Sequence, residues 1–223
     1  MSEHLVGDLL IPSDLDELPI LSFRKKEFKA PRTIDLRDYC VKTQDQKDKP
    51  WCAAYAACGF ASNILWRKND YPEIFDPTPI YKYAKSIDGQ PDEDGTSLTA
   101  VLKGLLEYKY FDESICSIKV LRNTEQVRYA IHKFGCCLVG LMVSKEWYQC
   151  NPKKSTISGK TGKTILGGHA VLACGYNDDG VIIQNQWGIG WGKYGFALIT
   201  WAEFSREFVY GAVLNNCLTD FRI

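Results

Sequence analysis

The stretch that decides the fold is Gln46-Lys-Asp-Lys-Pro-Trp-Cys52-Ala-Ala-Tyr-Ala-Ala-Cys58-Gly-Phe-Ala-Ser-Asn-Ile-Leu-Trp66. It is polar up to Trp51, and from Cys52 onward it is apolar on nearly every face of a helix. A helix that is apolar all round is a buried helix. We therefore expect a core helix from about residue 50 to residue 67, with Asp48 as its cap and Pro50 in its first turn.

The position of Cys52 suggests a nucleophile. In the first turn of a helix, the positive end of the helix dipole stabilises a thiolate, which is the reactive form of cysteine. The alternative is a small, buried, apolar cysteine. The chain has nine cysteines but no Cys-x-x-Cys pair, so we expect no zinc site, no other metal and no cofactor. Disulfide pairing stays open.

The composition narrows the class of protein. Apolar residues make up 45% of the 223 residues, which is enough for a sizeable core and excludes global disorder. Lys plus Arg equals Asp plus Glu at 27 each, so the chain has no excess of positive charge with which to bind nucleic acid or an anionic membrane. No apolar run approaches the length of a membrane span. We expect a monomer with neither of these partners.

The N-terminus has no clear structural period. Residues 1–12 lack the basic start and the apolar stretch of a secretory signal, so we expect a protein that is cytoplasmic or exported without a signal peptide. Residues 1–29 mix acidic, apolar and basic patches, and we expect them to form an arm laid over the surface.

The remaining chain places helices first and strands second. Further helices are expected over 79–85, from Thr96-Ser97, and from Asn123-Thr124 to Gly135. Strand-length apolar runs follow at 136–143, 169–176, 181–185, 196–200 and 211–215, with a short helix over 201–207. This order predicts an α+β protein with a mainly helical lobe over 30–118 and a mainly β lobe over 119–223.

One of the three histidines has a specific setting. His4 lies in the arm and His132 on a helix, whereas His169 begins a strand directly after two glycines. Asn185 follows sixteen residues later, on the next strand. Adjacent antiparallel strands can place the two side by side, so that Asn185 holds one imidazole nitrogen and the other nitrogen faces a thiol.

Together these residues resemble a known family. Gln46, Cys52, His169 and Asn185-Gln-Trp-Gly-Ile-Gly-Trp-Gly192 resemble the papain-like cysteine peptidases over roughly residues 32–215. The segments 81–89 and 94–98 look like a bacterial-type branch of that family. The resemblance implies two lobes with the active-site cleft between them: a helical lobe around a buried central helix, and an antiparallel, β-barrel-like lobe.

The same resemblance implies a role for each residue. Cys52 attacks a peptide carbonyl as a thiolate, His169 protonates the leaving amine, and Asn185 orients the imidazole. The side-chain amide of Gln46 and the backbone N–H of Cys52 form the oxyanion hole, in which one donor is worth about 3–4 kcal/mol. A thioester acyl-enzyme is the implied intermediate, and peptides or proteins are the implied substrates.

The implied substrate-binding residues are Gly95, Thr96, Gly168 and Trp187. Gly95 and Thr96 align with the backbone ledge that pairs with an extended peptide. Gly168 stands where relatives often carry Asp or Asn, which widens the primary pocket, and Trp187 covers the His169–Asn185 bond. The alternatives are ordinary turn glycines and ordinary core packing.

Two departures from the family concern the cleft. The usual Cys-Gly-Ser-Cys-Trp reads Lys49-Pro-Trp-Cys52-Ala, so a cysteine and an aromatic residue are missing. His169 lies 117 residues after Cys52, short of the usual ~130–150, which indicates trimmed loops.

Three functions remain open on this evidence. The first is a thiol peptidase, the second an acyl transferase or deamidase that uses the same residues, and the third a non-catalytic papain-like binding module. Residues 1–29 add a further alternative, a short inhibitory prosegment or a simple tail.

Overall fold

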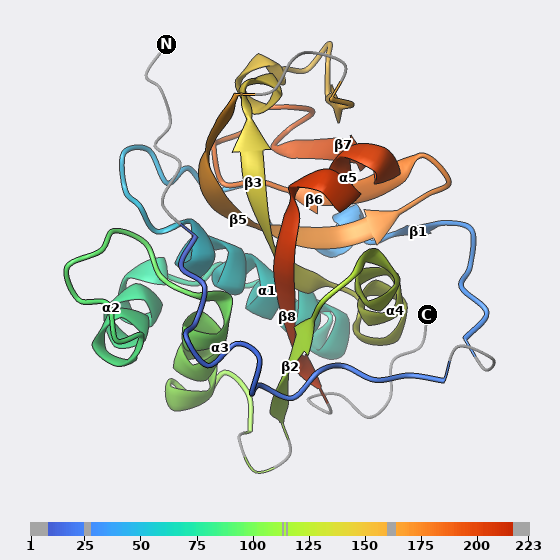
Figure 1. Cartoon of the computed structure of the whole chain (residues 1–223). Helices are drawn as coiled ribbons and strands as arrows, with labels where there is room; N and C mark the ends of the chain where they lie inside the picture. Colours follow the sequence, from blue (N-terminus) through green and yellow to red (C-terminus); the bar gives the residue numbers. More distant parts are fainter. Residues whose placement is uncertain (1–8, 25–27, 113, 115, 160–163, 216–223) are drawn as a thin grey trace.

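The helices and the sheet occupy different sides of the molecule (Figure 1). In this computed structural model, α1, α2 and α3 lie on one side, and the sheet, flanked by α4 and α5, lies on the other. The structure describes residues 9–24, 28–112, 114, 116–159 and 164–215. This arrangement agrees with the predicted α+β class, while the division at residue 118 stays a prediction.

Helix α1, Cys52–Asn69, is the core helix that the sequence predicts. Its alanines Ala53, Ala54, Ala56 and Ala57 are all buried, although they point to different sides of the helix. The helix ends at Asp70, which adopts a left-handed backbone conformation, as the turn-forming sequence there predicts.

The predicted start of α1 is wrong in two respects. The N-cap is Trp51, without a side-chain hydrogen bond, so Asp48 does not cap the helix and Pro50 lies before its first turn. Lys49 Nζ lies over the Trp51 ring at 4.3 Å, and the same ring stacks on Tyr81 at 4.7 Å. Aromatic packing therefore holds Trp51 at the start of α1, where no side chain caps the helix.

Each of the other helices begins directly after a residue whose side chain caps it. α2 is Pro77–Ile87, α3 is Leu98–Glu107, α4 is Thr124–Phe134 and α5 is Trp201–Glu207. Ser97 caps α3 by accepting from Ala100 N, and Asn123 caps α4 by accepting from Gln126 N. The starts of α3, α4 and α5 confirm the predicted ones, whereas α2 begins two residues before the predicted residue 79.

The sheet comprises eight strands within the described residues, in the order β2-β8-β3-β5-β6-β7-β4, with β1 paired to β5. The strands are β1 Ile34–Asp35, β2 Ser117–Leu121, β3 Cys137–Ser144, β4 Thr156–Ile157, β5 Ile165–Tyr176, β6 Gly180–Gln184, β7 Phe196–Thr200 and β8 Phe208–Asn215. The pairings are antiparallel except that between β4 and β7. Short 3-10 helices cover Arg37–Tyr39 and Lys145–Gln149.

Strands β1, β2 and β4 and the early start of β5 were not predicted. β2 has no strong alternation of its own, and it exists because its five residues pair with Gly211–Asn215 of β8. β5 begins at Ile165, four residues earlier than expected, because those residues pair with the end of β3. His169 is therefore inside a strand and not at its start.

The arm is attached to the rest of the molecule by two buried leucines and by hydrogen bonds. Leu10 and Leu21 are buried, and Leu21 N donates to Val120 O at 2.9 Å on β2. Arg122 and Gln126 donate to the carbonyls of Leu15 and Leu21. Residues 15–20 are exposed or half-buried, so this part of the arm lies over the surface as predicted, and its hydrogen bonds attach it to the sheet side of the molecule. Residues 1–8, with His4, and 25–27 lie outside the described residues.

Substitutions on α1 test the burial of its first three turns. Ala57→Leu adds volume at a site with 0% exposure, so we expect the free energy of unfolding to fall by about 1–3 kcal/mol. Lys68→Leu, on the exposed last turn of the same helix, should change it by no more than about 0.5 kcal/mol. Urea unfolding measures both, and equal effects would contradict the burial of α1.

Candidate active site

His169 and Asn185 lie side by side on neighbouring parts of the sheet. His169 is on β5 opposite Leu141 of β3, and Asn185 follows the last residue of β6. His169 Nε2 lies 2.8 Å from Asn185 Oδ1, and both residues are buried. An amide oxygen only accepts hydrogen bonds, so Nε2 carries the hydrogen in this contact. Asn185 therefore fixes both the orientation and the tautomer of the ring.

Cys52 is the first residue of α1, and it shares a contact with His169 through the side chain of Gln186. The side-chain nitrogen of Gln186 donates to Cys52 O at 3.3 Å and lies 3.4 Å from His169 Nε2. One amide nitrogen thus contacts both residues, although they are 117 positions apart in the chain. Cys52 is only 1% exposed. The structure brings the predicted nucleophile and the predicted base to the same place.

Gln46 reaches the site through a short antiparallel contact between two loops. Asp45 pairs with Trp187, Gln46 N donates to Gln186 O at 2.8 Å, and Gly188 N donates to Gln44 O at 3.1 Å. The contact needs Gly188, whose φ is +75°. The side-chain nitrogen of Gln46 also donates to Lys49 O at 2.8 Å, which holds the amide beside the start of α1.

Aromatic rings enclose His169. The Trp187 ring lies 4.9 Å from the imidazole, and the Trp147 ring meets it edge-on at 5.8 Å. Trp147 is fully buried, and its Nε1 donates to Glu207 Oε2 at 2.9 Å. Sequence reasoning missed Trp147, because nothing in its local sequence marks it. These rings exclude water from one side of the His169–Asn185 bond.

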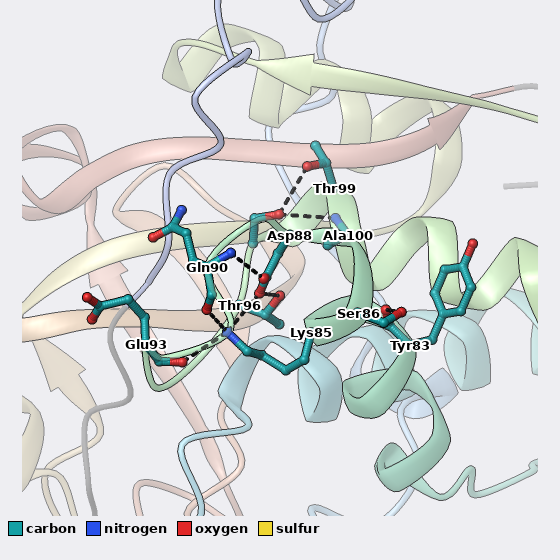
Figure 2. A network of polar contacts seen from close by, with 10 residues as sticks. Tyr83, Lys85, Ser86, Asp88, Gln90, Glu93, Thr96, Thr99 and Ala100 are labelled. Atoms are coloured by element: carbon teal, nitrogen blue, oxygen red, sulfur yellow. Dashed lines mark hydrogen bonds and ion pairs between the residues drawn. The ribbon is translucent and has the colours of Figure 1, made fainter.

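A network around Asp88 holds Thr96 in the loop before α3 (Figure 2). The Asp88 carboxylate accepts from Thr96 Oγ1 at 2.8 Å and pairs with Lys85 at 3.0 Å. Lys85 in turn donates to the carbonyls of Gln90 and Glu93. Gly95 has a φ of +80° and Thr96 is buried. The Thr96 side chain thus stabilises the loop.

Gly168 lies beneath the N-terminal arm. A Cβ on Gly168 would lie 2.5 Å from Leu9 Cβ, and a Cβ on Gly140 would lie 2.4 Å from Leu9 Cδ2. Next along the arm, Leu10 O accepts from Tyr210 Oη at 3.1 Å, and the same hydroxyl accepts from Leu98 N at 2.8 Å. Residues 9–10 therefore span from the strand that carries His169 to the first residue of α3.

The other cysteines differ from Cys52 in their surroundings. Burial raises the pKa of Cys58 and the pKa of Cys150 to about 12 each, so both stay protonated near neutral pH. Cys116 is disulfide-bonded, whereas Cys40 is free and partly exposed. Cys217 lies outside the described residues.

Two kinds of feature are absent from the described residues. They contain no group of three or more His, Cys, Asp or Glu side chains arranged to hold a metal ion. In the same part of the chain, no helix has the length and apolar character needed to cross a membrane.

Comparisons with solved structures confirm the predicted papain-like fold. Xylellain, a cysteine protease from Xylella fastidiosa, is 18% identical, with a TM-score of 0.75 over 96% of this chain and 97% of that one. The proCathepsin B S9 from Trypanosoma congolense is 15% identical, with a TM-score of 0.71 over 93% and 85%. The digestive procathepsin L 3 from Tenebrio molitor larval midgut is 15% identical, with a TM-score of 0.70 over 94% and 76%. No curated protein sequence matches the chain.

The sequence itself matches one family. Residues 85–208 match Peptidase_C1, the papain family cysteine proteases. The matched residues include His169 and Asn185, whereas Gln46 and Cys52 precede them. The match spans more than half of the chain and contains its most specific motif, residues 185–192. The chain therefore belongs to the papain family of cysteine proteases.

Proposed function

We propose that this cysteine peptidase hydrolyses peptide bonds with Cys52 as nucleophile, His169 as acid and base, and Asn185 as the residue that orients the imidazole. The observation that carries the proposal is the 2.8 Å contact of His169 with Asn185, next to the residue that starts α1. The position of Cys52 at that helix start favours a thiolate.

The proposed reaction has two halves. The Cys52 sulfur attacks the carbonyl carbon and forms a carbon–sulfur bond, while the carbonyl electron pair moves onto oxygen. The oxyanion accepts from Cys52 N–H and from the Gln46 side-chain amide. Collapse breaks the C–N bond, and the proton on His169 goes to the leaving amine. Water then attacks the thioester, gives a proton to His169, and releases the acid and the thiolate.

Selective alkylation tests the nucleophile. We expect iodoacetamide to modify Cys52 much faster than Cys40, which is the most exposed free cysteine in the described residues. Exposure alone predicts the reverse order, so the comparison separates activation from access. Peptide mass mapping gives the two rates. Cys58, with a pKa of about 12, should stay unmodified.

Two variants complete that test. Cys52→Ala should abolish peptide hydrolysis, and His169→Ala should slow alkylation at Cys52 while leaving Cys40 unchanged. Equal modification of Cys52 and Cys40 in the parent chain, or hydrolysis by Cys52→Ala, would refute the proposed nucleophile.

The acceptor of the acyl group needs its own test, because a thioester can react with water or with an amine. We expect water to be the acceptor. The measurement is the product mass from a peptide substrate in the presence of a competing amine. Free acid should dominate, and a product that is mainly the amide would instead assign the chain as an acyl transferase.

We also propose that the arm inhibits the enzyme by occupying the substrate-binding side of the site. Leu9 packs on Gly168, directly before His169, and Leu10 is bonded through Tyr210 to Leu98, two residues after Thr96. Leu9 therefore covers Gly168, and Leu10 is joined through Tyr210 to the first residue of α3, which follows the predicted substrate-binding residues Gly95 and Thr96. A peptide substrate would have to displace these two arm residues.

A matched pair of variants tests the arm. Leu9→Asp puts a charge against Gly140 and Gly168, so we expect a higher kcat/KM on a fluorogenic peptide. Ile11→Asp is the control, because Ile11 is 50% exposed. A chain lacking residues 1–11 should behave like Leu9→Asp, since it keeps the bonds to Leu15 and Leu21. Unchanged kinetics in both would exclude inhibition by these residues.

A further inference from the structure

Gln186 connects every part of the proposed site. Its side-chain nitrogen donates to Ala170 O on β5 at 2.7 Å and to Cys52 O on α1 at 3.3 Å, and lies 3.4 Å from His169 Nε2. Its backbone nitrogen donates to Asn185 Oδ1 at 2.9 Å, and its carbonyl accepts from Gln46 N. The residue is 5% exposed. None of its contacts depends on substrate.

The hydrogens of the Gln186 amide can be assigned. Asn185 Oδ1 accepts from Gln186 N and from His169 Nε2, so that Nε2 has no lone pair left for a second donor. An amide nitrogen has two hydrogens. One goes to Ala170 O at 2.7 Å, and the other goes to Cys52 O, the remaining acceptor. The amide therefore joins α1 to β5 with both of its donors.

This link lies between the two segments whose separation matters for the reaction. Ala170 directly follows His169, and Cys52 is the first residue of α1. A misplacement of about 1 Å between reacting groups can cost about a hundredfold in rate. We infer that Gln186 is a positioning residue, which sets the separation of the Cys52 thiol from the His169 imidazole. The inference rests on the proposed catalytic roles of those two residues.

The chain offers a matched control for this inference. Gln184 is also buried and lies two residues earlier, and its side-chain nitrogen donates to Val41 O at 2.7 Å and to Thr43 Oγ1 at 3.2 Å. It has the same chemistry and comparable burial. Its side-chain bonds go to the loop before α1 and not to Cys52 or β5, although its backbone pairs with Leu172 of β5. A loss that is merely structural should affect both glutamines alike.

The experiment compares Gln186→Met with Gln184→Met in the full chain. Met fills a similar volume but donates no hydrogen bond. For Gln186→Met we expect kcat on a fluorogenic peptide to fall about a hundredfold with KM within about twofold, and alkylation of Cys52 to slow relative to Cys40. For Gln184→Met we expect kcat, KM and the alkylation ratio to stay within about twofold of the parent. Urea unfolding shows that each variant is folded.

A second variant keeps the inference testable if Gln186→Met does not fold. Gln186→Leu also donates no hydrogen bond and introduces no buried charge, so it should show the same loss of kcat. If the parent is active and either folded Gln186 variant keeps its kcat, the inference is overturned while the proposed function stands. An equal loss of kcat in Gln184→Met has the same consequence. A parent without peptidase activity overturns the proposed function and this inference with it.

Discussion

The structure depends on the way the start of α1 is fixed against the loop after β6. Gln46 N donates to Gln186 O, Gly188 N donates to Gln44 O, and the Gln186 side chain donates to Cys52 O. These bonds join two segments that are about 140 residues apart in the chain. Because eleven residues of α1 between Cys52 and Ile64 are buried, the helix cannot shift to relieve an error at its first residue. The position of Cys52 therefore follows from the whole core.

Burying so many polar groups in one place requires that they bond to one another. Gln46, His169, Asn185 and Gln186 are all buried, and each makes a hydrogen bond within the site. A buried amide or imidazole without partners would cost several kcal/mol, so the hydrogen bonds that these residues make favour one arrangement of the site. The aromatic rings of Trp147 and Trp187 close that arrangement from one side. Stability and preorganisation of the site thus have the same physical origin.

Much of this could be predicted from sequence, where the signal is local. The apolar faces of α1, the caps Ser97 and Asn123, and the motif at 185–192 each act within a few residues, and the corresponding elements lie where expected. The predictions that were wrong or missing concern residues whose partners lie far away in the sequence. β2 forms only because β8 pairs with it, and Trp51 starts α1 by packing on Tyr81 while Asp48 makes no cap. Trp147 and Gln186 were missed for the same reason, since each gains its role from residues far along the chain.

The central claim is that Cys52 and His169 face each other as one reacting pair. A bifunctional reagent whose two electrophilic carbons flank a single carbonyl, such as 1,3-dibromoacetone, tests it directly in the full chain and in the chain lacking residues 1–11. Peptide mass mapping should find one cross-link, which joins the peptide containing Cys52 to the peptide containing His169. Modification of Cys52 without that link, or a link from Cys52 to any other residue, would contradict the account.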